Sequence, residues 1–279
     1  MHSWADWIGR TETREDVITP GLIARFHATI DRKGGADPAP QGVHWCLCLP
    51  DAATAALGPD GHPRRDDSPD SFLPPIPLPR RMWASSQVTF HAPLPLGAQV
   101  RRRSTVAAIT EKMGGTGPLV FVDIDHQTEV AERCLISERQ TLVYRAAADT
   151  PPAPRPADQT PDLGAWDWHR VLTPSEPLLF RYSALTFNSH RIHYDRPYAE
   201  AEERYRGLVV HGPLMATLLL DLAARELGDN RLSRFAFRGQ SPAIAGEPLY
   251  LVGRQEATGL TLAALGGDGR LVMSADASL

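Results

Sequence analysis

Apolar residues recur at helical spacing in three parts of the chain. Residues 19–30 open with threonine and proline, a frequent sequence at helix starts, and continue with apolar positions three and four apart. Residues 214–227 carry a broad leucine-rich face and stop before Gly228, a residue type that often ends helices. Residues 198–205 indicate a third, shorter helix. The pattern therefore predicts one amphipathic helix near the start of the chain and two in its second part.

A compact apolar run follows the first of these helices. Residues 43–49 include Trp45, and the alanine-rich residues 50–57 extend the run, so we expect a buried helix here. Residues 58–81 then hold seven prolines among charged residues, which excludes a regular helix or strand. Loops of this length are usually functional or disordered. We expect this one to act as a lid or as a contact for a partner.

The remaining apolar segments have the composition of strands. They are rich in valine, isoleucine, threonine and phenylalanine, and turns with glycine or proline separate them. The segments are residues 85–91, 99–109, 119–127, 131–144, 166–172, 232–239, 249–257, 260–265 and 270–277. Neighbouring segments are close enough in sequence to pair as antiparallel strands.

The chain divides at a second proline-rich segment. Residues 146–161 contain five prolines and show no periodicity, as expected of a linker. We therefore predict domains at 1–145 and 162–279, each combining helices with long antiparallel strands. The fold class is α+β, with the same architecture occurring twice in tandem.

Charge and cysteine content narrow the functional classes. The formal net charge of −4 argues against a nucleic-acid partner, because phosphate binding requires a basic surface. The three cysteines lack the spacing of a zinc site or a disulfide framework. No segment approaches the roughly 20 apolar residues of a membrane span, and the first residues lack a signal peptide. We expect a cytoplasmic protein that does not bind a membrane.

Groups capable of chemistry concentrate in one stretch. Residues 180–199 combine an amide, imidazoles, a carboxylate and arginines within twenty positions, and residues 209–217 add His211 and Gly212. A hydrophobic core requires none of these groups. The stretch therefore predicts a functional site in the second domain, whereas the first domain has no matching pattern.

Part of this stretch resembles a known signature. Residues 192–199, Ile-His-Tyr-Asp-Arg-Pro-Tyr-Ala, resemble the end of the MaoC-like (R)-enoyl-CoA hydratase motif, Ser/Thr-Gly-Asp-x-Asn-Pro-Ile/Leu-His-x-Asp-x-x-Tyr/Phe-Ala. Asn188 stands where that family has its catalytic aspartate, and His190-Arg191 replaces its Asn-Pro. With residues 209–213 and 72–83, the stretch is similar to the branch of mesaconyl-C4-CoA (3-methylfumaryl-CoA) and itaconyl-CoA hydratases.

The resemblance implies a tandem (double) hotdog fold, in which a long antiparallel sheet wraps around a central helix in each half. It also implies a hydro-lyase that adds water across the C=C bond of a short branched dicarboxylic enoyl-CoA, giving citramalyl-CoA. The CoA thioester is the substrate, and no separate cofactor or metal is expected. Pairing of two chains into a homodimer is possible in such proteins.

The chemistry of hydration assigns candidate roles. His193 suits the acid/base role, because an imidazole can accept and return a proton near neutral pH. Asn188 can orient the water through its carbonyl but cannot exchange a proton. The proton transfers therefore fall to His193 alone, or His190 or Asp195 shares them, and we favour His193 alone.

Further residues are expected to hold the substrate. Pro213 is expected at the first position of a helix with Gly212 just before it, so the Gly212 N–H can stabilise the thioester oxygen as negative charge develops there. Arg191 is the candidate for the free carboxylate of a dicarboxylic acyl group. The other expected substrate-binding residues are His190, His211, Tyr182 and Asp195.

Other interpretations predict different outcomes. The histidines could be structural, or His190, His193, His211 and Asp195 could bind a metal, although we expect none. A dehydratase of linear (R)-3-hydroxyacyl thioesters requires a long apolar tunnel for its substrate. A hotdog thioesterase requires a carboxylate that activates water, and a binding module shows no turnover.

Overall fold

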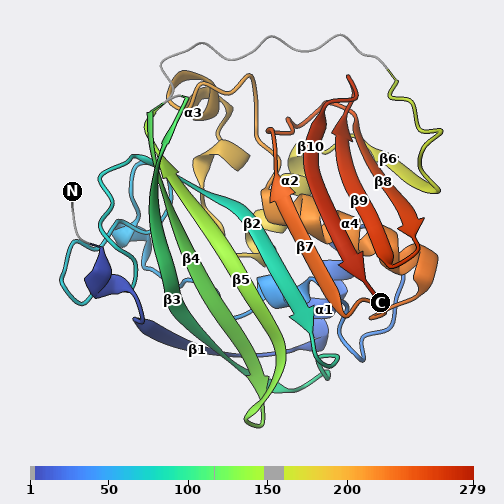
Figure 1. Cartoon of the computed structure of the whole chain (residues 1–279), viewed down its shortest axis with the longest axis horizontal. Coiled ribbons are helices and arrows are strands. Elements are labelled where there is room, and N and C mark those ends of the chain that lie inside the picture. The colour runs from blue at the N-terminus through green and yellow to red at the C-terminus, as the bar shows by residue number, and fades with distance from the viewer. Residues whose placement is uncertain (1–3, 116, 148–159) are drawn as a thin grey trace.

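The structure is a computed structural model that describes residues 4–115, 117–147 and 160–279. Within these ranges, ten strands form one continuous antiparallel sheet (Figure 1). The first half contributes β1 (Thr11–Val17), β2 (Arg80–Phe90), β3 (Gln99–Gly114), β4 (Gly117–Val130) and β5 (Arg133–Arg145). The second half contributes β6 (Trp168–Leu172), β7 (Arg234–Gly239), β8 (Leu249–Glu256), β9 (Gly259–Gly266) and β10 (Leu271–Ser278).

The two halves have the same strand order. The whole sheet runs β1-β3-β4-β5-β2-β7-β10-β9-β8-β6, so each half places its first, third, fourth, fifth and second strands side by side. The second strands therefore meet at the centre, where β2 and β7 pair over Ser85–Thr89 and Arg234–Arg238. The repeated order confirms the tandem α+β architecture expected from the sequence. Most of the expected linker, residues 148–159, lies outside the described residues.

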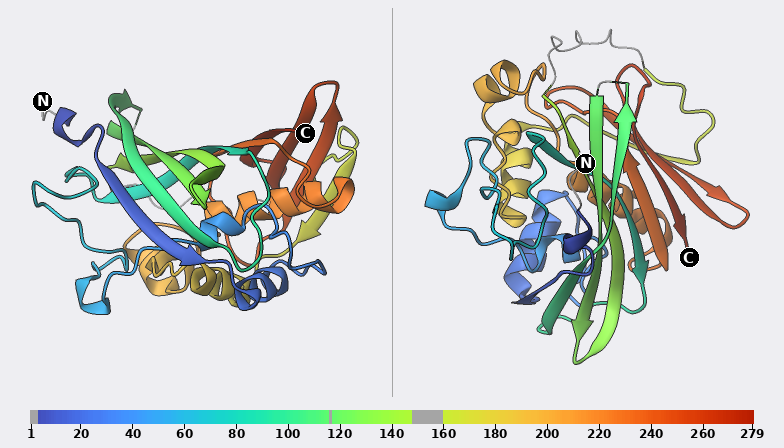
Figure 2. Two further views of the ribbon diagram at one scale, coloured as in Figure 1. Left: turned by 90° about the horizontal axis from the view of Figure 1, so that it is seen from below. Right: turned by 60° about the vertical axis from the view of Figure 1, so that its left-hand side comes forward.

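The helices cover one face of the sheet. They are α1 (Pro20–Thr29), α2 (Glu176–Leu185), α3 (Arg196–Ala201) and α4 (Gly212–Leu227). Ten of the sixteen residues of α4 are buried, because it lies in the hollow of the curved sheet (Figure 2). Helices α1 and α2 lie side by side on the other side of α4. No helix in the described ranges is long and apolar enough to cross a membrane.

Within the described residues, the first half has no long central helix. The expectation of a buried helix over residues 43–57 is wrong, because only Val43–Cys46 forms a 3-10 turn and a second such turn, Thr54–Ala56, is exposed. The chain passes close to α4 at Gly42, where an added Cβ would lie 3.3 Å from Leu220. The first-half turn therefore packs against the central helix of the second half, and one core spans both halves.

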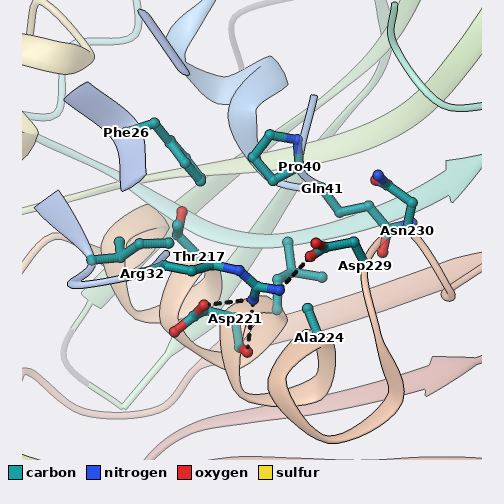
Figure 3. A pocket seen from close by; sticks show the side chains of 11 residues that line it. Phe26, Arg32, Pro40, Gln41, Thr217, Asp221, Ala224, Asp229 and Asn230 are labelled. Atoms are coloured by element: carbon teal, nitrogen blue, oxygen red, sulfur yellow. Dashed lines mark hydrogen bonds and ion pairs between the residues drawn. The ribbon is translucent and has the colours of Figure 1, made fainter. Parts of the chain in front are cut away.

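An ionic cluster joins the halves at the far end of α4. Asp221 is 3% exposed and accepts hydrogen bonds from Arg32 of the first half and from Arg170 and Arg225 of the second, at 2.7–2.8 Å. Arg32 also contacts Asp229 (Figure 3). The pocket drawn there has a volume of about 10 Å³, room for about one water molecule. We therefore interpret this cluster as a structural link between the halves.

Candidate functional site

His193 is held by a backbone carbonyl. It ends the 3-10 turn Arg191–His193, and the residue is 7% exposed. Nδ1 lies 2.7 Å from the carbonyl oxygen of Val209, which can only accept, so Nδ1 carries the proton and Nε2 keeps its lone pair. Burial, together with the charges of His190 and His62, lowers the pKa of His193 to about 3, although the Val209 bond opposes the shift. In the free protein, His193 is therefore neutral and its Nε2 is the basic atom.

His211 stacks on the ring of His193. Their centroids are 3.6 Å apart and their planes differ by 18°. Nε2 of His211 shares a hydrogen bond of 2.9 Å with the Ser183 hydroxyl, whereas its buried Nδ1 has no partner in the described part of the chain. Burial, and then the charge of His193, lowers the pKa of His211 well below its ordinary value. The pair of rings brings α2 and the start of α4 together at the motif.

Tyr182 packs against His211 of this pair. Its side chain is 1% exposed, its ring meets His211 edge-on at 5.2 Å, and its hydroxyl shares a 3.2 Å hydrogen bond with Thr217. Burial raises the pKa of Tyr182 well above its ordinary value. The sequence suggested a substrate-binding residue, but the structure places Tyr182 in the core as a support for His211.

Asn188 shapes the loop that presents His190. Its side-chain oxygen accepts the backbone N–H of His190 at 3.0 Å, and its own N–H donates to the carbonyl of Ser183. The oxygen expected to orient water is thus engaged in a local turn. The ring of His190 meets that of His193 edge-on, with centroids 5.5 Å apart.

Arg191 and Asp195 bind each other. Nε and Nη2 of Arg191 donate to Asp195 Oδ2 at 2.9 and 2.6 Å, and the guanidinium lies over the ring of Tyr198. Asp195 also accepts the backbone N–H of Tyr198 as the N-cap of α3. Both residues were expected to bind substrate. The structure instead shows them holding the motif in place.

Gly212 is the first residue of α4, after the N-cap His211. The sequence pattern placed proline there, but Pro213 follows it. The nearest atom to a Cβ added at Gly212 is the carbonyl oxygen of Trp83 at 3.9 Å, an ordinary contact. Packing within the chain therefore does not require glycine here, and its N–H lies at the positive end of a sixteen-residue helix.

The first half contributes two residues that sequence reasoning missed. Asp60 and His62 lie in the proline-rich loop, with Oδ2 of Asp60 3.0 Å from Nδ1 of His62. The ring of His62 lies 4.1 Å from that of His190, so four imidazoles contact one another in a row. The only signal in the sequence was that an aspartate and a histidine flank Gly61. This pattern is too short to predict that the two residues lie at the site.

The same residues are the best candidates to surround a metal ion. One donor atom each of Asp60, His62 and His190 lies within 4.8 Å of the others. The hydrogen bond between Asp60 and His62 already uses a carboxylate oxygen and a ring nitrogen. We therefore interpret the group as a pair that shares a proton.

A neutral imidazole beside the N-terminus of a central helix, within a tandem hotdog sheet, defines a hydratase or dehydratase of thioesters. The family profile described as hydroxyacyl-thioester dehydratase type 2 (Htd2) matches residues 42–245, and the chain belongs to this family.

Individual relatives agree with this assignment. The chain is 44% identical over 280 residues to the mesaconyl-C(4)-CoA hydratase of Chloroflexus aurantiacus, covering 99% of this chain and 98% of that protein. A MaoC-like dehydratase from Phytophthora capsici shares the fold with a TM-score of 0.70 at 16% identity, covering 97% and 95% of the two chains. A Mycobacterium tuberculosis protein described as a double hotdog fold has a TM-score of 0.60 at 15% identity, covering 97% and 95%. These similarities confirm the double hotdog fold and the enzyme class.

Proposed function

We propose that this protein hydrates mesaconyl-C4-CoA (3-methylfumaryl-CoA) or itaconyl-CoA to citramalyl-CoA. The observation that carries the proposal is the 44% identity, over nearly the full length of both chains, to a mesaconyl-C(4)-CoA hydratase. The buried imidazole and the helix N-terminus beside it supply groups that this reaction needs. The substrate is a CoA thioester, and no further cofactor enters the scheme.

The reaction begins at His193. Its Nε2 takes a proton from water as the water oxygen bonds to the β-carbon of the enoyl thioester. The π electrons of the C=C bond move into the thioester, giving an enolate, and the α-carbon then takes up a proton. His193 can return the proton it received, so the net change is the addition of one water. The tautomer fixed by Val209 leaves the required lone pair on Nε2.

The backbone N–H of Gly212 is suited to donate a hydrogen bond to the enolate oxygen. Its N–H is at the first position of α4, where the helix dipole favours negative charge. A donor of this kind contributes about 3 kcal/mol to a transition state. Because neither packing nor a left-handed backbone explains glycine here, we attribute it to close approach of the thioester.

Arg81 suits the free carboxylate of the acyl group better than Arg191 does. Arg191 is engaged by Asp195, by the ring of Tyr198 and by the carbonyl of Pro59. Arg81 on β2 is close enough for its charge to lower the pKa of His190, yet among the described residues its guanidinium has no hydrogen bond or ion pair. An unpaired guanidinium beside the imidazoles would favour a dicarboxylic substrate.

The proposal is tested by following the ultraviolet absorbance of the enoyl thioester, with product mass, on mesaconyl-C4-CoA, itaconyl-CoA and crotonyl-CoA. We expect one water to be added to a branched dicarboxylic ester, and a loss of about 10²-fold or more in His193→Ala. His169→Ala, a change at an exposed histidine of β6, is the matched control. Arg81→Gln should cut the preference for the dicarboxylic ester over crotonyl-CoA roughly 10- to 100-fold, whereas exposed Arg103→Gln should not.

Other results assign other functions. Turnover of crotonyl-CoA in preference to the branched esters would indicate a dehydratase of linear chains. Release of free CoA without water addition would indicate a thioesterase, and saturable binding without turnover would indicate a binding module.

A further inference from the structure

The tip of the proline-rich loop is fixed to the catalytic motif. Leu57 and Pro63 form a β-bridge that closes a short hairpin. Three hydrogen bonds from Ser189 and Arg191 hold the tip of this hairpin. The carbonyl of Asp60 accepts the Arg191 N–H at 2.8 Å, and that of Gly61 accepts the Ser189 hydroxyl at 2.5 Å. The carbonyl of Pro59 accepts Nη1 of Arg191 at 2.9 Å.

Gly61 permits this close approach. Its φ is +87°, a conformation that disfavours other residues, and a Cβ added there would lie 1.9 Å from the carbonyl oxygen of Ser189. The loop therefore docks at one defined position, with Asp60 and His62 on either side of the glycine.

The docked tip places the Asp60 carboxylate at one end of the row of four imidazoles, which runs His62, His190, His193 and His211. Asp60 binds Nδ1 of His62, His62 packs on His190, and His190 meets His193. Burial alone would raise the pKa of Asp60, but the hydrogen bond and charge of His62, with the charge of His190, lower it to about 2. Asp60 is therefore ionised at neutral pH and is available to balance one positive charge on the row.

The other charged groups near the row do not supply that balance. Asp195 is paired with Arg191 and caps α3. Burial lowers the pKa of His190 most, and the charges of His62, of Arg81 on β2 and of His211 at the start of α4 lower it further. Among the described residues whose charges act on His190, Asp60 is the group that favours its protonated form.

We propose that Asp60 and His62 of the first half complete the acid/base apparatus of the second-half site, acting through His190 on the protonation of His193. Through His62 and His190, the Asp60 carboxylate offsets part of the positive charge that the row gains when His193 takes a proton from water. Nε2 of His193 then gives this proton to the α-carbon of the enolate, so one water is added and the row returns to its starting state. No oxidant, reductant or metal enters this scheme. The inference rests on the proposed hydration.

The test compares Asp60→Asn and His62→Gln with wild type across pH. Asp66→Asn, at an exposed aspartate that caps a turn of the same loop, and His169→Gln are matched controls. We expect kcat to fall about 100-fold with KM changed less than threefold in the first two variants, and no change in the controls. In Asp60→Asn, the part of the pH–rate profile that depends on a protonated imidazole should move to lower pH. The variant lacks the Asp60 carboxylate, whose negative charge favours protonation of the imidazoles.

A second measurement does not depend on turnover. In the proton NMR spectrum, the Nδ1–H of His62 bound to a carboxylate should give a downfield resonance that Asp60→Asn removes and Asp66→Asn retains. Absence of water addition by wild type would refute the proposed function, and this resonance would still report whether the hydrogen bond between Asp60 and His62 exists.

Three results would overturn the inference. Unchanged kcat in both variants would show that the pair is structural. A change confined to KM would make it a substrate contact. Stoichiometric metal in the purified protein, lost in both variants and required for turnover, would show that Asp60, His62 and His190 bind an ion instead.

Discussion

The imidazoles at the site are neutral because several lie together in a buried place. Burial lowers the pKa of both His190 and His193 to about 3, and each ring disfavours a charge on its neighbour. A base this weak would be slow in the free protein. A bound dicarboxylic thioester brings negative charge beside the row, and the enolate adds more, so the imidazolium becomes favourable when the reaction requires it.

The neutral histidines should make stability depend on pH. In an unfolded chain an imidazole titrates near pH 6.5, whereas His190 and His193 do so at about 3 in the folded protein. Between these values the unfolded state binds more protons, so the free energy of unfolding should fall as the pH decreases from about 6.5 to about 3. Each histidine contributes a slope of up to ~1.4 kcal/mol per pH unit, and stability above this window is unaffected.

Urea denaturation at a series of pH values measures this slope. His193→Gln should reduce it by about one proton's contribution, and the exposed His169→Gln should leave it unchanged. An equal slope in wild type and His193→Gln would contradict the folded-state titration assigned to His193.

Among single residues, the sequence identified those of the motif but not the residues that contact them from other parts of the chain. His190, His193 and His211 do come together, because Val209, two residues before His211, binds the ring of His193 and the carbonyl of Ile192. Arg191 was expected at the substrate, but the sequence could not show that Asp195 lies one helical turn away and binds it. Asp60 and His62 could not be found, because a contact across more than a hundred residues leaves no local pattern.

Among the elements, α4 holds the molecule together at both ends. Its start presents Gly212 to the site, and near its end Asp221 binds three arginines. Because the Asp221 carboxylate is 3% exposed, removing its charge leaves buried guanidinium groups without a partner.

Asp221→Asn should therefore lower the free energy of unfolding by about 3–5 kcal/mol. Asp229→Asn removes an acid that also contacts Arg32 but is 47% exposed, so its cost should stay within about 1 kcal/mol. Chemical denaturation of the two variants beside wild type makes the comparison. Equal losses would show that burial of Asp221 is not what sets its contribution.

Strong local patterns predicted elements well, and weak ones did not. The helix expected at residues 214–227 is α4, and the helix expected at 19–30 is α1, because both combine a start signal with a continuous apolar face. Strand β1 was missed because its sequence is charged and its burial alternates between exposed and intermediate at the sheet edge. Helix α2 was missed because only Leu179, Tyr182 and Leu185 of its ten residues are buried, a weak apolar face, although Ser175 caps it.

Over the whole molecule, the sheet and core make the halves one unit. Phe235 of β7 pairs with Val88 of β2 at the central seam, and both side chains are fully buried in the shared core. An apolar core that crosses the seam couples the unfolding of one half to that of the other.

Unfolding should therefore be a single transition. Circular dichroism, which reports the whole sheet, and tryptophan fluorescence should give coincident urea curves. Phe235→Ala should lower the free energy of unfolding by about 3–5 kcal/mol, and unfolding should remain a single transition. Two separated transitions in wild type would mean that the halves unfold independently.

The docked hairpin also bears on how such a protein can change over time. Gly61 leaves no space beyond the carbonyl of Ser189, so residues 59–62 and 188–193 form a single complementary unit, although they are far apart in the gene. Recombination that exchanges one half for that of a distant relative separates this unit, whereas exchange of both segments keeps it. We therefore expect the two halves to be exchanged functionally only as one whole, even though their strand order shows two equivalent parts.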